Sequence, residues 1–290
     1  MHTTKNEINY LIDLPYAQRQ FVVVVEDSIK QAEDEAKKAV EQTKEKEDFT
    51  KVFKNILVFM NPGSMIVDAT IRLIKAIKDL NLQGLNILQL SQSESQVLSF
   101  PPGHPRTGIL YVAHPAIKGH YFPTAHFHRL TFEHKFAEAA TLLMALGATE
   151  LEVHHNDGWS KEFAVNLSVP LDILPKNVGG SLSKKDKASN QILFKANLKD
   201  NTSFTLPSNL FWYASEPTWQ QIAEGRLKYG LRDFRLIIQY EDDYGVNANL
   251  KAKLAKAGLD LGGKFENHKS TKWAIRGKFG ERVYNHFNER

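Results

Sequence analysis

Residues 132–147 read FEHKFAEAATLLMALG and residues 215–230 read SEPTWQQIAEGRLKYG, and the two stretches match at a constant offset of 83 positions. The offset needs no gap to bring a helical pattern, its terminal glycine, an apolar strand pattern and a Gly-Gly pair into register. The matched pairs are Glu133 with Glu216, Phe136 with Trp219, Ala140 with Ala223, Gly147 with Gly230, Leu151 with Phe234, Val153 with Leu236, and Gly179-Gly180 with Gly262-Gly263. This agreement predicts a tandem duplication, with copies at about 115–200 and 201–285.

Each copy is predicted to hold one helix that ends at its glycine, followed by three antiparallel strands. Turn-forming residues separate the first two strands, at Asn156-Asp157-Gly158 in the first copy and at 242–245 in the second. The expected strands are 150–155, 163–171 and 192–198 in the first copy and 233–240, 246–254 and 273–279 in the second. Two such copies predict an α+β domain with helices on one face of an antiparallel sheet.

One stretch of the second copy has two interpretations. Apolar and polar residues alternate over 246–254, which is the pattern of a half-buried strand. Leu250, Leu254 and Ala257 also share one face of a helix, and the residues between them are helix formers. The alternation favours the strand, and a helix over 249–258 remains the alternative.

The residues before the first copy have a different pattern. Helices are predicted over 26–48, 49–60 and 64–80, because apolar residues recur at helical spacing and Ser64 is suited to the N-cap position. A short strand is expected at 85–90. A polar stretch and Pro101-Pro102-Gly103 follow, and both are typical of a boundary. The sequence thus predicts a mainly helical region over 1–95 and an α+β domain over 96–290.

Composition limits the possible classes of protein. The chain has 290 residues, with 37 Lys and Arg against 33 Asp and Glu, 11 His and no Cys. These values suit a soluble globular protein, and the lack of Cys excludes disulfides, Cys-ligated zinc, iron–sulfur clusters and thiol nucleophiles. The longest early apolar run, Phe21 to Val25, is far too short to span a bilayer, and no signal-peptide pattern precedes it. A cytoplasmic location is therefore expected.

Histidines are concentrated in the first copy. If the helix and strand on either side of Gly147 run antiparallel, His134 and His154 both lie about 20 Å from the turn. His134 is therefore expected to face one of His154 or His155, with Glu138 one helical turn away. The candidates for a histidine-rich pocket are His126, His128, His134, His154 and His155. No recognised zinc-ligand spacing is present, so structural histidines are the favoured interpretation, and neither a metal nor a cofactor is expected.

The C-terminal residues carry the excess of positive charge. Residues 245–290 hold 10 Lys and Arg against 4 Asp and Glu, a difference of +6 compared with +4 for the whole chain. The proposed basic face consists of Lys251, Lys253, Lys256, Lys264, Lys269, Lys272, Arg276 and Lys278. Phe265, Trp273 and Phe279 alternate with these residues and are expected to point into the core. This arrangement favours a lysine face that is simply solvated over a surface that recognises nucleic-acid bases.

Phosphate-loop, dinucleotide-binding, nucleophile-elbow and kinase motifs are missing from the sequence. We therefore expect a non-enzymatic effector that binds another protein or self-associates through its basic C-terminal face. An anionic membrane is the next candidate partner, because 246–265 and 265–279 have the pattern of an amphipathic hairpin. Nucleic acid is the least favoured partner. The alternative function is an enzyme or small-ligand-binding protein that uses the histidine-rich pocket.

Overall fold

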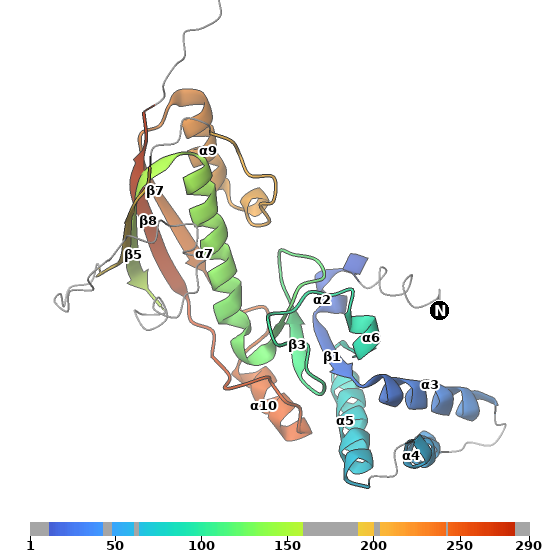
Figure 1. The fold of residues 1–290 in the computed structure, drawn as a ribbon. Coiled ribbons are helices and arrows are strands. Elements are labelled where there is room, and N and C mark those ends of the chain that lie inside the picture. Colours follow the sequence, from blue (N-terminus) through green and yellow to red (C-terminus); the bar gives the residue numbers. More distant parts are fainter. Residues whose placement is uncertain are drawn as a thin grey trace, which may run out of the picture. The chain divides into compact units, whose positions relative to one another are not determined.

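The computed structural model describes residues 12–42, 48–60, 64–158, 191–199, 204–241 and 243–281, which form two compact units (Figure 1). Unit 1 consists of residues 1–129 and 244–267, and unit 2 consists of residues 130–243 and 268–290. The boundary expected at residue 95 does not coincide with this division. Strand β1 (Phe21–Val25) pairs with β3 (Leu110–Ala113), so hydrogen bonds between strands join the two sides of that boundary.

Unit 1 is built on a four-stranded sheet in the order β2-β1-β3-β4, with β2 at Ile87–Ser91 and β4 at Tyr121–Pro123. Strand β1 is parallel to β2 and antiparallel to β3. All five residues of β1 are buried, because the strand is central and both of its faces are covered. This strand was not among the predicted elements, and its residues were noted only as too few to span a membrane. Its β-branched valines are typical of a central strand.

The described residues between β1 and β2 form three helices, which confirm the helices predicted before residue 95, although residues 43–47 of the first prediction lie outside the described residues. Phe21, Val23 and Val25 share one core cluster with residues of these helices, and Val22 and Val24 belong to a second cluster with Tyr111. The helices of this part of unit 1 are α2 (Tyr16–Arg19), α3 (Asp27–Gln42), α4 (Phe49–Met60), α5 (Ser64–Leu82), α6 (Gln92–Ser95) and the short η1 (Thr124–His126).

The prediction of a strand over 246–254 is wrong, because this stretch forms helix α10 (Ala248–Ala257) in unit 1. The Asn247 side chain caps the helix by accepting hydrogen bonds from the backbone N–H groups of Asn249 and Leu250. Gly258 ends it in the left-handed conformation, with φ 75°. Leu250 and Leu254, one turn apart, are buried in the unit 1 core. These caps and this spacing outweigh the strand-like alternation. The amphipathic hairpin expected over 246–279 is therefore wrong as well.

Unit 2 contains a four-stranded antiparallel sheet in the order β6-β5-β8-β7, with helices on one face (Figure 1). The ring of Trp273 in β8 packs against Phe132 and Phe136 of α7, at centroid distances of 4.9 and 5.4 Å. Helix α9 covers the same face, since Arg226 lies over the ring of Phe279. The elements are α7 (Phe127–Ala145, which begins in unit 1), β5 (Ala148–Asp157), β6 (Gln191–Asn197), η3 (Tyr213–Ser215), α9 (Pro217–Tyr229), β7 (Asp233–Tyr240) and β8 (Thr271–Phe279).

The mixed α+β class is confirmed, and the strands expected at 150–155, 192–198, 233–240 and 273–279 are present. The strand expected at 163–171 and the pair Gly179-Gly180 lie outside the described residues. The turn expected at 242–245 leads into α10 rather than a hairpin, with Tyr244 and Gly245 both at positive φ. The duplication itself remains a prediction.

Candidate functional site

The five candidate histidines divide between the two units. His126 and His128 lie in unit 1, where both serve the local structure. Nδ1 of His126 is 3.0 Å from Oε1 of Glu266, which also pairs with Arg129 at 3.2 Å. Nε2 of His128 lies 2.5 Å from the carbonyl oxygen of Val246, and the side chain is buried. A carbonyl only accepts, so this nitrogen is the donor. His128 thus fixes the chain just before α10.

His134 and Glu138, in unit 2, hold the segment that precedes α9. Nδ1 of His134 accepts a hydrogen bond from the indole N–H of Trp212 at 3.0 Å. The buried Glu138 carboxylate accepts from the backbone N–H groups of Phe211, Trp212 and Tyr213, at 2.8, 2.7 and 3.0 Å. A carboxylate that accepts three backbone donors satisfies groups that would otherwise be buried without partners. The polar residues of α7 therefore anchor the segment that precedes α9.

His154 and His155 point to opposite faces of the unit 2 sheet. His155 pairs in register with Trp273, whose ring packs on α7, so it shares the helix-covered face. His154 pairs with Ala274 and faces the other side, where its Nε2 lies 3.4 Å from Oε2 of Glu152. Consecutive strand residues alternate between faces, so of the two strand histidines only His155 shares a face with α7. A meeting of His134 with His154 is thereby excluded, and a meeting of His134 with His155 stays a prediction. Among the described residues, no group of three or more His, Asp or Glu is arranged to hold a metal ion.

The eight basic residues are all exposed, but they also divide between the units. Lys269, Lys272, Arg276 and Lys278 belong to unit 2. Lys272, Arg276 and Lys278 alternate along β8 on the face away from the helices, together with acidic residues of β5. Nζ of Lys278 is 3.5 Å from the Glu150 carboxylate, and Lys195 of β6 binds Glu152 at 2.6 Å. The Lys195 ammonium holds the pKa of Glu152 below its usual range. This face therefore carries mixed charge.

The other four lysines form a separate group in unit 1, which we call the α10 lysine surface: Lys251, Lys253, Lys256 and Lys264. None of the four forms an ion pair with a carboxylate in the described part of the chain. The aromatic side chains expected to be internal are buried: Phe265, Trp273 and Phe279 are 8%, 1% and 5% exposed. Nζ of Lys251 lies 5.7 Å from the ring centroid of Phe265.

The two acidic residues nearest the α10 lysine surface in sequence are already engaged. Asp260 accepts a hydrogen bond from the backbone N–H of Gly262 at 2.8 Å. Glu266 pairs with His126 and Arg129. Between residues 248 and 267 the chain holds four lysines and these two acids, so the segment keeps a net charge of +2. The lysines therefore remain available to an external anion.

Glu26 lines a pocket of unit 1 and was not among the residues that the sequence predicted to be functional. An acidic residue directly after a five-residue apolar run was the available signal, because polar residues at the ends of buried strands often reach binding crevices.

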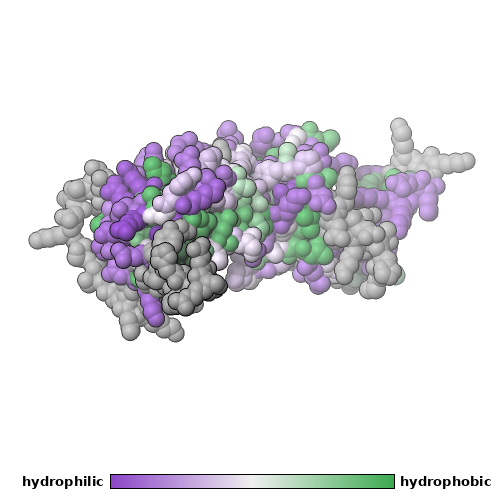
Figure 2. All heavy atoms as spheres, turned by 90° about the horizontal axis from the view of Figure 1, so that it is seen from above, coloured by the Kyte–Doolittle hydropathy of each residue, from purple (hydrophilic) through white to green (hydrophobic). Residues whose placement is uncertain are grey.

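Apolar side chains are also exposed in both units. Phe59 on α4 is 90% exposed, and Leu82 and Tyr229, at the ends of α5 and α9, are each 79% exposed. On the face drawn in Figure 2, hydrophobic residues lie interspersed among hydrophilic ones. None of the helices in the described ranges has the combination of length and apolar character needed to cross a membrane. Comparisons with protein-family models, with curated proteins and with solved structures found no match to this chain.

Proposed function

We propose that this protein is a non-enzymatic effector that binds an acidic surface of another protein through the α10 lysine surface. The supporting observation is that four exposed lysines lie on and just after a capped helix, with no carboxylate partner among the described residues. Burial of Leu250 and Leu254 fixes the orientation of this helix on unit 1. Charges on a rigid element need less ordering on binding than charges on a loose chain.

The chemistry of the surface favours an acidic protein over nucleic acid. Lysines are point charges without the forked geometry that reads base edges, and Phe265 is buried rather than available for stacking. Self-association is a second form of the same proposal, in which the acidic surface belongs to another copy of the chain. An anionic membrane would share the charge requirement and is separated from a protein partner by the experiment below.

The test compares two double charge reversals in the full chain. Lys253→Glu/Lys256→Glu changes the α10 lysine surface, and Lys38→Glu/Lys51→Glu is the matched control, on exposed lysines of α3 and α4. The probes are poly-L-glutamate, vesicles with anionic headgroups and a single-stranded oligonucleotide, each titrated across salt concentrations. We expect the α10 variant to lose about tenfold in affinity for poly-L-glutamate and the control to change less than about twofold.

An equal loss of poly-L-glutamate affinity in both variants would contradict the proposal. It would indicate that binding depends on the net charge of the protein and not on the α10 lysine surface. Vesicle or oligonucleotide binding that depends on Lys253 and Lys256, without poly-L-glutamate binding, would replace the protein partner by a membrane or a nucleic acid. Sedimentation of the wild-type chain and the α10 variant tests self-association.

We also propose that unit 2 arose by duplication at the 83-residue offset. Helix, strand and strand follow each other twice, as α7-β5-β6 and α9-β7-β8. Gly147 and Gly230, which the offset pairs, both have the positive φ that ends a helix, at 81° and 69°. The segment between β7 and β8 belongs to unit 1 and has no counterpart among the described residues of the first copy.

A further inference from the structure

Unit 1 contains a pocket of about 330 Å³ at the carboxyl end of β1. Its walls come from the end of β1, the first turn of α3, the N-terminal half of α5 and the segment before β3. The lining residues are Val25, Glu26, Ile29, Ala69, Thr70, Leu73, Thr107 and Gly108. A hydrogen bond from Gly108 N–H to the Val24 carbonyl, 2.8 Å long, fixes one wall to the strand. The pocket is therefore bounded by ordered elements.

The position of the pocket in the sheet is one where ligands commonly bind. Strand β1 has a parallel neighbour, β2, on one side and an antiparallel neighbour, β3, on the other. In sheets that contain parallel strands, binding crevices lie beyond the carboxyl ends of the strands, where the connections diverge. Here the chain leaves β1 for α3, and the segment before β3 approaches from the other direction, so the two leave a hollow between them.

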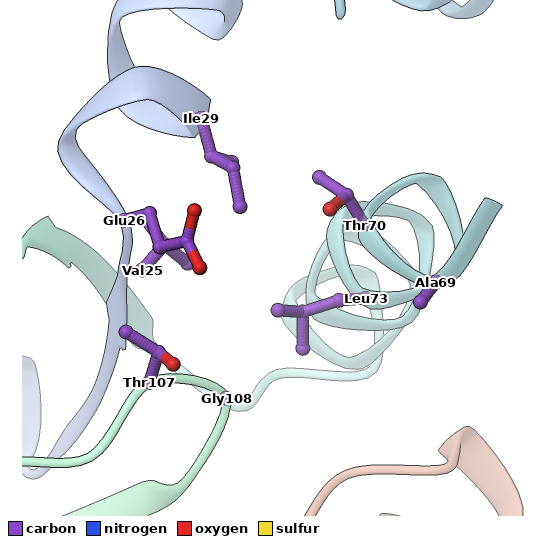
Figure 3. A pocket seen from close by; sticks show the side chains of 8 residues that line it. All are labelled: Val25, Glu26, Ile29, Ala69, Thr70, Leu73, Thr107 and Gly108. Atoms are coloured by element: carbon purple, nitrogen blue, oxygen red, sulfur yellow. The ribbon is translucent and has the colours of Figure 1, made fainter. Parts of the chain in front are cut away.

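The chemistry of the pocket is one carboxylate among apolar walls. Figure 3 shows the Glu26 carboxylate turned toward the space between Ile29, Thr70 and Leu73. Glu26 is the only ionisable residue among the eight that line the pocket. Its side chain makes no hydrogen bond or ion pair with another described residue. The hydroxyl groups of Thr70 and Thr107 are two further acceptors at the edges of the same space.

The neighbouring acidic residue, Asp27, does not face the pocket. The two acidic side chains at the start of α3 therefore have different roles. The Asp27 carboxylate accepts hydrogen bonds from both the backbone N–H and the hydroxyl of Ser93, each 2.9 Å long. These bonds hold the pKa of Asp27 below its usual range, with the backbone N–H as the largest cause. Asp27 thus joins α3 to α6, and Glu26 is left to face the pocket.

We propose that this pocket binds a small organic cation, a primary ammonium group on a compact branched apolar body. An ammonium group has three donors and no acceptor, which suits the Glu26 carboxylate and the two threonine hydroxyls. The apolar body would contact Ile29 and Leu73. An anionic ligand would meet the charge of Glu26 without a compensating cation from the lining residues.

The replacement Glu26→Gln is a clean test because it keeps the shape and removes the charge. The backbone carbonyl of Glu26 accepts from the N–H groups of Ile29 and Lys30, at 3.0 and 3.2 Å, and these bonds do not involve the side chain. The start of α3 is therefore expected to stay intact. Glu41→Gln, on an exposed carboxylate of the same helix, is the matched control.

The experiment follows backbone amide shifts of the full-length chain by NMR during titration with 3-methylbutylamine, 3-methylbutanol or 3-methylbutanoate. These probes share one apolar body and differ in charge. We expect the amine to shift the amides of Glu26, Thr70 and Gly108 with a dissociation constant of about 5 mM. The alcohol is expected to bind about fivefold more weakly, and the carboxylate not measurably.

The variants separate the contribution of the Glu26 charge to binding from the contribution of the space in the pocket. Glu26→Gln is expected to weaken the amine about fivefold and leave the alcohol unchanged, whereas Glu41→Gln changes neither. Ala69→Leu, which fills the pocket, is expected to weaken both probes. The proposal is overturned if the amine and the alcohol bind wild-type protein equally, if Glu26→Gln keeps the full amine affinity, or if no pocket amide shifts. None of these outcomes depends on Lys253 or Lys256, so this proposal and the proposed function can fail separately.

Discussion

Replacing Arg226 by Met is expected to destabilise unit 2 strongly, because its buried guanidinium ties three segments together. Nε donates to the Leu146 carbonyl at 3.1 Å, Nη1 to Leu231 at 3.2 Å and Nη2 to Gly280 at 2.7 Å. The side chain is 1% exposed. Methionine fills much of the volume and leaves these carbonyl groups without this donor. At about 1 kcal/mol for each buried acceptor, the loss is about 3 kcal/mol.

Two rings add to this effect. The guanidinium carbon lies 4.3 Å from the ring centroid of Phe204 and 5.0 Å from that of Phe279. Loss of these cation–π contacts adds about 1 kcal/mol, so the free energy of unfolding is expected to fall by about 4 kcal/mol in total. A typical domain has about 5–15 kcal/mol of stability, so the variant should still fold at 25 °C but unfold at much lower denaturant.

Tryptophan fluorescence during urea unfolding measures this change in unit 2 alone. The described Trp residues, Trp212, Trp219 and Trp273, lie in unit 2, and Trp219 and Trp273 are fully buried. We expect the urea midpoint to fall by about 2 M in Arg226→Met. Arg232→Met, an exposed arginine just after α9, should leave the midpoint unchanged. A shift of less than about 0.5 M in Arg226→Met would refute the argument that this side chain joins the segments.

Three further predictions concern other contacts. Glu138→Gln should lower the stability of unit 2 by about 2 kcal/mol in the same fluorescence assay, because three backbone donors lose a charged acceptor; a variant as stable as wild type would contradict this role. Gly258→Ala should cost about 1 kcal/mol in calorimetry through strain at positive φ, and no effect would contradict the left-handed helix end. Burial raises the pKa of Tyr121 to about 12. Because the folded-state pKa is the higher one, the stability that this shift contributes is fully present below pH about 10 and is lost as pH rises through about 12, so the tyrosinate absorbance of Tyr121 should appear near pH 12 while the protein stays folded, and not near pH 10. Early titration of Tyr121, measured as the difference from Tyr121→Phe, would contradict its burial.

The α10 segment shows where the local sequence allows two structures and the tertiary structure selects one of them. Its alternating residues fit a strand, and its leucine spacing and flanking residues, Asn247 and Gly258, fit a helix equally well. Periodicity in so short a segment does not separate the two. The core of unit 1 decides, because Leu250 and Leu254 pack there together with strands and helices that are more than a hundred residues away in sequence.

Helix and strand positions in most of the chain followed from the sequence by itself. The glycine stops at Gly147 and Gly230, the alternation of β7 and the helical spacing of α3 to α5 depend only on neighbours along the chain, and they predicted elements that the structure contains. Composition likewise excluded all cysteine chemistry. These are properties that a few adjacent residues determine.

Only the tertiary structure decided which residues lie together. Strand pairing places His154 and His155 on opposite faces, and the division into two units separates histidines and lysines that are close in sequence. The pocket around Glu26 joins residues 25–29, 69–73 and 107–108, which come together because α5 shares a core cluster with β1 and the Gly108 N–H binds the Val24 carbonyl. Contacts of such long sequence separation leave no periodic signal in the chain. A site built from them is therefore determined by the packing of the whole unit.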